Sequence, residues 1–467
     1  MQDVIFREYD IRGKVGQELI IDDVYNLIRA IAYYFLLKNT SIKKIAIGMD
    51  GRTHSLAIKQ ETCAALRESG LDVVFIGICP SPVLYFALHT MPIDAGIMIT
   101  ASHNPKEYNG FKICLGTTSL SGFQIQEIAH LFKQKKFVET NHLGRYEEIS
   151  LVNTYIEWLV NHFSYLQNNS LSAVIDCGNG AGAAVIPLLI KRMNWQNVKS
   201  ICDTIDGSYP NHEADPVVAE NMKEVKDILA ISDISVGIGL DGDADRMACM
   251  SKRGYLIPGD QLLAIFAQPI IKQNPGSAVV CDIKSSLGLL MMIEKMGGVA
   301  HMAPAGHAII KEHMKNTGAL IGGELSCHFI FNDRYFGYDD GIYAMMRLFE
   351  LLITSNNTVD ELMSDYPCLY SSHEFRIACD ENRKQDIIEH AKDYFGKKSG
   401  VSLLTIDGVR ANFYQGWGLI RASNTQPVIS IRLEASNEQA FNEIKEDFIF
   451  ALNDYLDVSQ LRTYQVD

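Results

Sequence analysis

The stretch Thr100-Ala-Ser-His-Asn-Pro105 decides how the chain is interpreted, because it places a serine directly after a buried strand. The apolar run Ala95-Gly-Ile-Met-Ile99 predicts that strand, and the following Asn104-Pro105 predicts a turn. α/β proteins tend to place chemistry on loops at such strand ends. A bare serine hydroxyl is a weak nucleophile and needs a base, a metal or a prior modification. Taken alone, the stretch is also consistent with a turn that Ser and Asn favour.

Length, composition and charge restrict the class of protein. A chain of 467 residues is too long for one hydrophobic core, and we expect three or four domains. The composition, 47% hydrophobic and 21% charged, is typical of a folded soluble protein. A net charge of -14 argues against nucleic acid or an anionic membrane as the main partner. A site for an anionic substrate must therefore be a local basic pocket in an acidic surface.

The cysteine spacing and the N-terminal residues predict a cytoplasmic location. The ten cysteines are scattered, so they form neither a CxxC motif nor an evident disulfide framework. The segment Met1-Gln-Asp-Val-Ile-Phe-Arg-Glu8 lacks the pattern of a signal peptide. No apolar run is long enough to span a membrane. A reducing cytoplasm is the expected compartment.

Three segments of the chain share one plan of strand, helix, second strand and third strand. Each starts with an apolar run that ends near an aspartate, at Asp50, Asp176 and Asp282. Each third strand ends in an unusual loop, and these loops are Thr100 to Pro105, Asp241 to Arg246 and Gly323 to His328. The pattern predicts three related α/β domains with mixed sheets, each offering one loop from an equivalent strand end.

The last hundred residues follow a different plan. They read as a strand near Glu374, a helix over about 381–395, several short strands, and a helix over about 436–455. This order predicts a C-terminal α+β domain. The expected domains are 1–150 with the serine loop, 151–254 with the acidic loop, 255–367 with a third loop, and 368–467.

The acidic loop Asp241-Gly-Asp-Ala-Asp-Arg246 has the chemistry of a metal site. Alternate side chains of an extended segment project to the same side, and three neighbouring carboxylates repel unless a cation neutralises them. Oxygen ligands of this kind suit Mg²⁺. An EF-hand is excluded, because Arg246 and Lys252 occupy the positions that need Gly and Glu. A solvated acidic turn is the alternative.

Two further loops carry polar groups suited to a sugar phosphate. Gly322-Gly-Glu-Leu-Ser-Cys-His328 offers a carboxylate, a hydroxyl and an imidazole, which can hydrogen-bond to sugar hydroxyls. Arg421-Ala-Ser-Asn-Thr-Gln-Pro427 lies between two expected strands, and its arginine and hydroxyls can hold a phosphate. Each loop, taken alone, is equally consistent with an ordinary polar turn.

Two glycine patterns match the loose dinucleotide-binding fingerprint, Gly178-Asn-Gly-Ala-Gly-Ala183 and Gly237-Ile-Gly-Leu-Asp-Gly242. The second overlaps the acidic loop, which shows how permissive the fingerprint is. No Walker A sequence occurs in the chain. A dinucleotide-dependent oxidoreductase is therefore a distant alternative.

The four loops, in this order, resemble the α-D-phosphohexomutase family, and the similarity covers essentially the whole chain. The most specific stretches are Thr100 to Pro105 and Asp241 to Arg246. Phe6-Arg-Glu-Tyr-Asp-Ile-Arg-Gly13 and Asn109-Gly-Phe-Lys112 also look like family motifs. The subgroup that the chain resembles most is phosphomannomutase/phosphoglucomutase.

The resemblance implies a four-domain protein with a central cleft and assigns roles to particular residues. It implies that Ser102 carries a phosphate and that one Mg²⁺ per chain binds Asp241, Asp243, Asp245 and that phosphoserine. The implied catalytic residues are Ser102, His103, Arg246, Lys112, Arg12 and His307, and the acid/base group among them stays unassigned. The implied substrate-binding residues are Tyr9, Lys284, His307, Glu324, Ser326, His328, Arg421, Ser423, Asn424 and Thr425.

The implied reaction is reversible phosphoryl transfer between the 1- and 6-positions of mannose and/or glucose phosphates. It proceeds through phosphoserine and a hexose 1,6-bisphosphate, which also serves as activator. Relatives usually have glycine at position 327, so Cys327 would be strained if the backbone there has a positive φ. Leu325 fits the phosphomannomutase/phosphoglucomutase subgroup better than the phosphoglucosamine mutases, which tend to have Gln there.

The expected partners are small hexose phosphates, without nucleic acid or membrane, and the expected state is a monomer or weak dimer. Three alternatives stay open: a phosphoglucosamine mutase, a metal-dependent sugar phosphatase acting through Ser102, and a sugar-phosphate binder without catalysis. A phosphatase would release inorganic phosphate, whereas a binder would show neither turnover nor phosphorylated Ser102.

Overall fold

The strand that precedes the serine loop is β4 (Ala95–Ile99), and all five of its residues are buried. A strand that is apolar on both faces belongs inside a sheet that is covered on both sides. Here β4 lies between β2 (Lys44–Met49), which is parallel to it, and β5 (Tyr108–Leu115), which is antiparallel. The mixed sheet expected from the sequence is confirmed.

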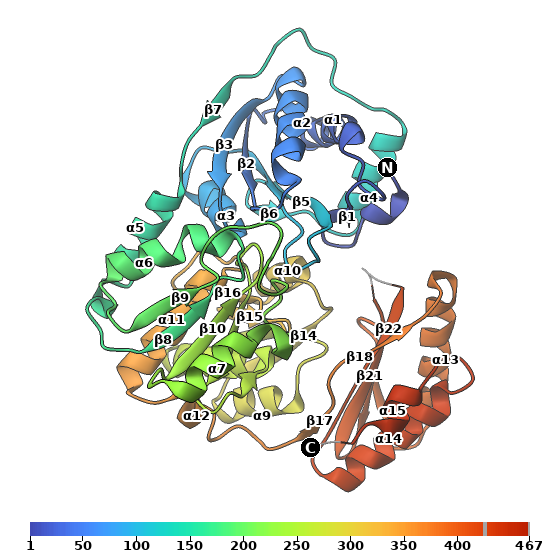
Figure 1. Cartoon of the computed structure of the whole chain (residues 1–467). Coiled ribbons are helices and arrows are strands. Elements are labelled where there is room, and N and C mark those ends of the chain that lie inside the picture. The colour runs from blue at the N-terminus through green and yellow to red at the C-terminus, as the bar shows by residue number, and fades with distance from the viewer. Residues whose placement is uncertain (424–426, 466–467) are drawn as a thin grey trace. The chain divides into compact units, whose positions relative to one another are not determined.

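The chain divides into two compact units, each built from two separate segments. The first unit comprises Met1–Leu262 and Ser326–Ser364, and the second comprises Leu263–Leu325 and Asp365–Asp467. The computed structural model describes residues 1–423 and 427–465, which Figure 1 draws as ribbon. No helix in these ranges combines the length and the apolar character needed to cross a membrane.

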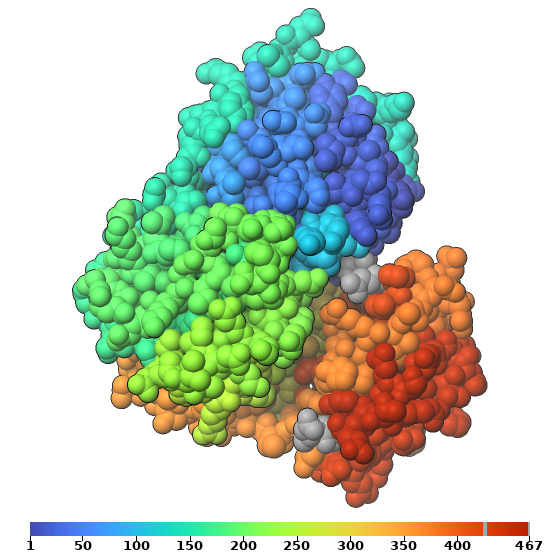
Figure 2. All heavy atoms as spheres, viewed as in Figure 1, coloured from blue at the N-terminus to red at the C-terminus, as the bar shows by residue number. Residues whose placement is uncertain are grey.

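The first sheet of unit 1 has the order β1-β5-β4-β2-β3-β7, with β6 paired to β5. Its helices α1, α2 and α4 share a core with one face, to which Ile45 and Ile97 belong. Helix α3 packs on β2 and β4, where Gly96 leaves room for Leu84 and Leu88. The blue to teal atoms on the surface in Figure 2 belong to this part of the chain. The remaining bounds are β1 (Ile11–Lys14), β3 (Asp72–Ile78), β6 (Thr118–Ser119), β7 (Tyr146–Glu148), α1 (Ile21–Lys38), α2 (Ser55–Glu68), α3 (Ser81–Thr90) and α4 (Phe123–Lys133).

The second sheet of unit 1 has the order β12-β11-β10-β8-β9 and repeats the plan of the first. Its first strand, β8, is flanked by two parallel neighbours, and β11 runs antiparallel to β10. Helix α11 (Gly341–Ser355), from the later segment of unit 1, packs against β10 and β11. The bounds of these strands and of the other elements of unit 1 are β8 (Ala173–Asp176), β9 (Val198–Ile201), β10 (Val236–Leu240), β11 (Met247–Ser251), β12 (Leu256–Ile257), β16 (Phe329–Phe331), α5 (Val152–His162), α6 (Ile186–Met193), α7 (Lys223–Ile231) and α12 (Val359–Leu362).

Unit 2 contains the third parallel strand set and the C-terminal sheet. Strand β13 (Ala278–Asp282) is parallel to both β14 (Val299–Ala303) and β15 (Ile321–Gly323), as the shared plan predicts. The C-terminal sheet has the order β17-β22-β21-β20-β19, with β18 also paired to β22. Figure 1 shows α13, α14 and α15 on one face of this sheet, and α13 and α14 contribute apolar residues to its core.

The bounds of the other elements of unit 2 are α9 (Leu287–Lys295), α10 (His307–Thr317), β17 (Tyr370–Ser371), β18 (Phe375–Ala378), α13 (Lys384–Gly396), β19 (Ser402–Leu404), β20 (Val409–Phe413), β21 (Gly416–Ala422), β22 (Val428–Ala435), α14 (Glu438–Leu452) and α15 (Ser459–Thr463). Helix α8 spans Gly259–Gln273, and short 3-10 helices are η1 (Asp3–Ile5), η2 (Ser164–Leu166), η3 (Ala181–Ala184), η4 (Ala219–Met222) and η5 (Glu381–Arg383). Arg421 is part of β21, so the expected loop between the two strands begins two residues later than the sequence indicated.

Candidate active site

Ser102 lies three residues beyond β4, on a loop whose backbone is held in an uncommon conformation. Its φ is 51°, in the left-handed region, and only 2% of the residue is exposed. The backbone N–H of Ser102 donates to the Thr100 hydroxyl at 2.9 Å, and Thr100 N–H donates to the Gly110 carbonyl at 3.0 Å. These bonds fix the serine at the strand end that the sequence predicts.

Arg52, for which the sequence gives no signal, fixes the serine loop by donating hydrogen bonds to its backbone carbonyls. Its guanidinium donates to the carbonyls of Ser102 and Pro105 at 2.7 Å each, and to those of Asn104 and Tyr108 at 2.5 Å and 3.0 Å. The side chain is fully buried and pairs with Asp50 at 3.2 Å. A planar donor fork can satisfy several carbonyls at once, so one residue fixes the whole loop.

The Ser102 hydroxyl faces the acidic loop. It donates to Asp241 Oδ2 at 2.6 Å, and its oxygen lies 3.2 Å from His103 Nδ1. Gly242 allows this approach, because a side chain there would lie 2.4 Å from the Ser102 carbonyl oxygen. The structure therefore brings the predicted nucleophile and the predicted metal loop together.

A turn brings together the carboxylates of Asp241, Asp243 and Asp245. The sequence predicted an extended loop instead. Ala244 has a φ of 56°, and its N–H donates to the Asp241 carbonyl at 3.0 Å, so the segment folds back on itself. All three residues are fully buried, and their ligand oxygens lie within 4.8 Å of one another. The convergence was expected correctly, but its expected cause, side-chain alternation, was wrong.

The three buried carboxylates repel one another unless positive charges neutralise them. Burial, followed by the charges of Asp245 and Asp243, raises the pKa of Asp241 well above its usual value. Lys112 Nζ lies 2.6 Å from Asp243 and also bonds to Asp245. Burial would lower the pKa of Lys112, but Asp243 and Asp245 outweigh it and raise that pKa.

The cluster fits a divalent cation. Lys112 and Arg246, whose Nε lies 4.0 Å from Asp241 Oδ2, supply two positive charges for three buried carboxylates. Asp243 Oδ1 is buried without a hydrogen-bond partner among the described residues. A buried carboxylate oxygen without a hydrogen-bond partner costs free energy, and a hard cation that this oxygen coordinates would remove that cost.

Arg246, His328 and His103 surround the cluster. Arg246 donates its backbone N–H to Asp241 Oδ1 at 3.1 Å and its Nε–H to His328 Nε2 at 3.3 Å. Burial, with the nearby charges of Arg246 and Arg12, lowers the pKa of His103 well below its usual value. A neutral imidazole beside the Ser102 hydroxyl can accept or return a proton.

The remaining predicted residues of unit 1 lie around the same two loops. Arg12 donates to the Asn104 side chain at 2.6 Å and pairs with Asp10. Ser326 Oγ lies 3.2 Å from His328 Nδ1, and Tyr9 is half-buried in the bend before β1.

The predicted substrate residues of unit 2 share one hydrogen-bonded network. Glu324, which follows β15, accepts a hydrogen bond from the Gly306 N–H at 2.7 Å. Gly306 is the residue directly before His307. Arg421 contacts Asp407 Oδ2 through Nε at 3.1 Å and Nη2 at 2.9 Å. Asp407 also accepts from Ala305 N–H at 3.1 Å, which connects the arginine to the loop before His307. Asp407 was missed because no motif surrounds it.

Lys284 and Ser423 complete the described residues of this group, and Glu374 is an acidic neighbour that the sequence did not indicate. Lys284 Nζ lies 3.9 Å from Asp282, at the end of β13. Burial would raise the pKa of Glu374, but the charges of Lys284, Arg376 and Arg421 outweigh it and lower that pKa to about 2. The Ser423 carbonyl accepts from Lys384 at 2.8 Å. Asn424 and Thr425 lie outside the described residues.

Cys327 meets the condition stated for strain. Its φ is 67° and only 2% of the residue is exposed. Its carbonyl accepts from Met247 N–H at 3.2 Å, which ties the residue to the start of β11.

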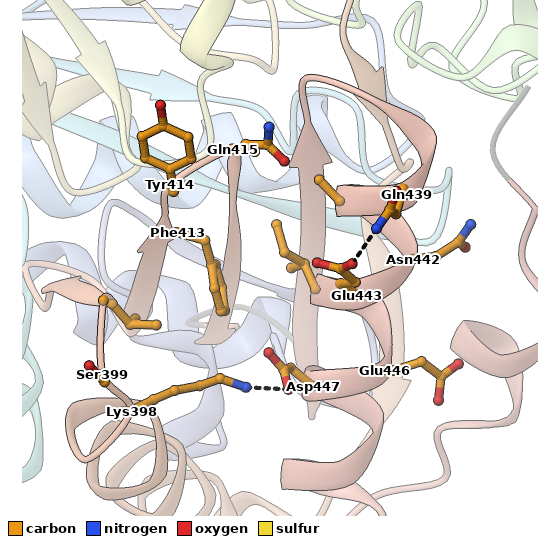
Figure 3. A pocket seen from close by; sticks show the side chains of 14 residues that line it. Lys398, Ser399, Phe413, Tyr414, Gln415, Gln439, Asn442, Glu443, Glu446 and Asp447 are labelled. Carbon is orange, nitrogen blue, oxygen red and sulfur yellow. Dashed lines mark hydrogen bonds and ion pairs between the residues drawn. The ribbon is translucent and has the colours of Figure 1, made fainter.

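A separate cavity of about 870 Å³ lies on unit 2 beside α14 (Figure 3). Among its lining residues are Lys398, Phe413, Tyr414, Glu443 and Asp447, and Lys398 pairs with Asp447. None of the described residues that the sequence analysis assigned to a site lines this cavity.

Comparison with protein families finds four consecutive matches along the chain. The matched descriptions are phosphoglucomutase/phosphomannomutase alpha/beta/alpha domain I at 3–139, domain II at 153–254, domain III at 258–370, and the C-terminal domain at 374–450. A phosphoglucomutase of Neisseria gonorrhoeae is 38% identical over 445 residues, covering 95% of each chain. A phosphomannomutase/phosphoglucomutase of Pseudomonas aeruginosa is 35% identical, covering 95% of this chain and 94% of the relative.

Solved structures also match the chain over nearly its full length. The crystal structure of a phosphoglucomutase/phosphomannomutase family protein from Burkholderia thailandensis matches with a TM-score of 0.88 at 31% identity, over 100% of both chains. A structure from Thermus thermophilus matches this fold with a TM-score of 0.79 at 22% identity, over 97% of this chain and 100% of the other. The chain places a serine on a strand-end loop that is bonded to a buried triple-aspartate turn, and it is similar to these proteins from end to end. The chain belongs to the phosphoglucomutase/phosphomannomutase family.

Proposed function

We propose that this protein reversibly transfers a phosphoryl group between the 1- and 6-positions of hexose phosphates, with mannose and/or glucose as the sugar. The observation that carries the proposal is the 2.6 Å bond from the Ser102 hydroxyl to Asp241, within the buried aspartate cluster. Phosphoserine 102 donates its phosphoryl group to one substrate hydroxyl, which gives a hexose 1,6-bisphosphate. The other phosphate of that bisphosphate then returns to Ser102, so phosphate is conserved.

His103 is the proposed proton carrier at Ser102. When the P–O bond to Ser102 breaks, the serine oxygen needs a proton, and His103 Nδ1 lies 3.2 Å away. Its lowered pKa keeps it neutral between turnovers, so it can accept the proton that the attacking substrate hydroxyl loses and pass that proton to the serine oxygen; the same path runs in reverse when serine is rephosphorylated. Lys112 is less suited, since its raised pKa holds its proton. Arg12 stays protonated and is the least suited base.

Asp241, Asp243 and Asp245, with an oxygen of phosphoserine 102, would hold one Mg²⁺ per chain. The bound cation would neutralise charge on the transferring phosphoryl group. Phosphoserine adds about 1.5 to 2 negative charges near pH 7. Arg246, whose guanidinium Nε lies 4.0 Å from Asp241 Oδ2, would share this task.

The remaining predicted residues would bind the substrate. Lys284, His307, Glu324, Ser326 and His328 would contact the sugar and Tyr9 would assist. Arg421, Ser423, Asn424 and Thr425 would hold whichever phosphate is not reacting, and a hexose 1,6-bisphosphate would serve as activator. The network through Asp407 supports this role, because it fixes the Arg421 guanidinium next to the loop of His307.

The proposal includes four domains divided after residues 150, 254 and 367, and a monomer or weak dimer. It also includes a reducing, cytoplasmic setting, which is supported by the ten cysteines, none of which forms a disulfide within the described residues.

Mass analysis of active protein tests the proposal most directly. We expect one phosphate on Ser102, and near-complete loss of turnover in Ser102→Ala but not in the exposed control Ser41→Ala. Active protein without phosphate on Ser102 would overturn the mechanism.

A side-by-side assay of mannose, glucose and glucosamine phosphates separates the remaining alternatives. Interconversion of both the mannose and the glucose pair is expected, because these sugars differ only at C2. Strong preference for glucosamine phosphate would indicate a phosphoglucosamine mutase. Release of inorganic phosphate would indicate a phosphatase, and binding without turnover would indicate a binding protein.

A further inference from the structure

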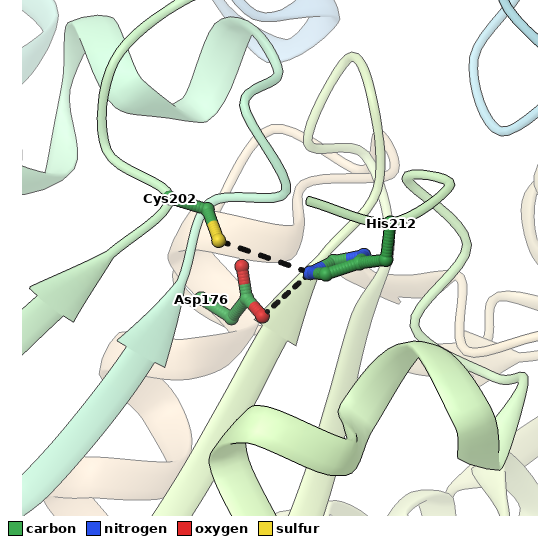
Figure 4. Close-up of side chains that lie close together, drawn as sticks. All are labelled: Asp176, Cys202 and His212. Atoms are coloured by element: carbon green, nitrogen blue, oxygen red, sulfur yellow. Dashed lines mark hydrogen bonds and ion pairs between the residues drawn. The ribbon is translucent and has the colours of Figure 1, made fainter. Parts of the chain in front are cut away.

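A second group of metal-binding side chains lies at the end of the second sheet of unit 1, apart from the aspartate cluster. Asp176 is the last residue of β8, and Cys202 directly follows β9. These strands are parallel, with Asp176 paired to Ile201, so both side chains leave the same edge of the sheet. His212 reaches them from the segment between β9 and α7 (Figure 4).

The ligand atoms of these three residues point at one another. His212 Nε2 lies 2.9 Å from Asp176 Oδ2 and 3.9 Å from Cys202 Sγ. All three ligand atoms lie within 4.8 Å of one another. Glu224, in the first turn of α7, places Oε2 3.9 Å from the same sulfur. A tetrahedral cation with bonds of about 2.0–2.3 Å spaces its ligand atoms roughly 3.3–3.8 Å apart.

Backbone groups bond to the second polar atom of His212 and of Asp176 and so orient both side chains. His212 Nδ1 bonds to the Glu213 carbonyl at 2.9 Å, which leaves Nε2 as the atom that faces the group. Asp176 Oδ1 accepts from Gly178 N–H at 2.8 Å, which leaves Oδ2 facing it. Metal-binding histidines and carboxylates are typically fixed in this way by their second atom.

The arrangement does not fit a cysteine nucleophile. In such a site the imidazole activates the thiol with one nitrogen and is oriented by an acid at the other. Here the thiol and the carboxylate both face Nε2, while Nδ1 is bonded to a backbone carbonyl. A plain histidine–aspartate ion pair also leaves the thiol and Glu224 unexplained, because one N–H cannot serve several acceptors well.

We propose that Asp176, Cys202 and His212 bind a thiophilic divalent cation of the Zn²⁺ class. A thiolate and an imidazole select such a cation, whereas the all-oxygen aspartate cluster suits Mg²⁺. The two sites therefore discriminate between metals by ligand chemistry.

The proposed site would stabilise a loop that reaches the serine loop. Between Cys202 and His212 the chain carries Tyr209, whose ring lies 5.2 Å from the Arg52 guanidinium. Arg52 in turn holds the Ser102 carbonyl. A cation that joins Cys202 to His212 would close the loop that carries Tyr209 and so brace the support of Ser102.

Cobalt substitution tests the proposal. Purified full-length protein is treated with a chelator and titrated with Co²⁺, which gives a thiolate-to-cobalt absorption band when cysteine is a ligand. We expect one equivalent to produce the band and Zn²⁺ to displace it. Cys202→Ser should abolish the band, and His212→Gln should weaken Co²⁺ binding at least about 100-fold, since even outer partners of ligands contribute 10–100-fold.

Two controls keep the test specific. Cys368→Ser, at an exposed thiol, and Asp243→Asn, in the aspartate cluster, should both keep the band. Circular dichroism checks that each variant is folded, and Zn²⁺ should raise the melting temperature of the wild type but not of folded Cys202→Ser. A wild type without a band, or a band that survives Cys202→Ser, would overturn the proposal.

Discussion

Three residues of the candidate site adopt a backbone conformation that side chains usually avoid. Ser102, Ala244 and Cys327 have φ values of 51°, 56° and 67°. A left-handed conformation costs a non-glycine residue about 1–2 kcal/mol. Strain of this kind persists where the surrounding structure over-determines it, often at functional sites. Here it aims the serine hydroxyl and folds the aspartates together.

Cys327 allows the strain to be measured. In ordinary backbone, alanine is more stable than glycine by about 0.5–1 kcal/mol, but a positive φ removes that advantage. We expect Cys327→Gly to be at least as stable as Cys327→Ala in urea unfolding. The control is the same pair of changes at buried Cys114 in β5, where alanine should be the more stable variant. An equal alanine advantage at both positions would contradict strain at Cys327.

Glu374 predicts a pH dependence of stability. Its folded pKa is lowered to about 2 from an ordinary 4.5, so its contribution is complete above pH 4.5 and is lost as the pH falls toward 2. Glu374→Gln should lower the free energy of unfolding at pH 7 by about 3 kcal/mol. The difference from wild type should shrink between pH 4.5 and pH 3 in urea titrations. The exposed control Glu446→Gln should show little difference at any pH, and a Glu374 effect that stays constant would refute the assignment.

At the scale of elements, the strands and the loops that follow them were predictable from the sequence. β4 matches the apolar run that predicted it, and β8 and β13 end at Asp176 and Asp282, the aspartates near which their predicted runs end. The helical pattern from Ala183 to Met193 predicts one helix, but the segment begins as η3 and continues as α6 from Ile186, next to a proline at the start of the helix.

The residues that hold these loops in place were not predictable, because they are distant in the sequence from the residues they contact. Arg52 bonds to carbonyls about fifty residues away, and a backbone carbonyl leaves no signature in a sequence. Asp407 and Glu374 were missed for the same reason, since only the fold brings them to Arg421. The turn at Ala244 was missed because alanine gives no signal for a positive φ.

Arg52 yields a prediction about the serine loop as an element. Arg52→Lys keeps the charge but replaces a planar fork by a single ammonium, so several of the four carbonyl bonds are lost. We expect kcat to fall about 100-fold, since a displacement of about 1 Å can cost that much, with KM changed far less. Metal binding should persist. Arg192→Lys, an exposed arginine in unit 1, is the control, and an unchanged kcat in Arg52→Lys would show that the loop holds itself.

At the scale of the whole molecule, unit 2 depends on contacts between its two separate segments. Arg410 of β20 is 1% exposed and donates to the carbonyls of Ile283 at 2.6 Å and Ser285 at 2.8 Å. Its guanidinium lies 3.7 Å from the centre of the Trp417 ring. Glu434 accepts from both Trp417 Nε1 and Leu287 N–H at 2.8 Å. These buried polar contacts fasten the C-terminal sheet to the segment that carries Lys284.

Arg410→Met tests whether unit 2 unfolds as one body. The change leaves two buried carbonyls without donors, at about 1–3 kcal/mol each. We expect the free energy of unfolding of unit 2 to fall by about 3 kcal/mol, and the calorimetric transition to broaden or split. Arg383→Met, at an exposed position of the same unit, is the control. An unchanged, sharp transition in Arg410→Met would show that apolar contacts suffice.

The division of unit 1 into two segments has a consequence for the growing chain on the ribosome. Helix α11 is buried from Gly341 to Phe349 and covers β10 and β11, and Tyr343 stacks on Tyr335 at 3.9 Å. When residue 262 has just been translated, that cover does not yet exist. At 5–20 residues per second, the nascent unit waits on the order of 5–20 s for residue 364. During that interval the outer face of a finished sheet is a natural client for chaperones.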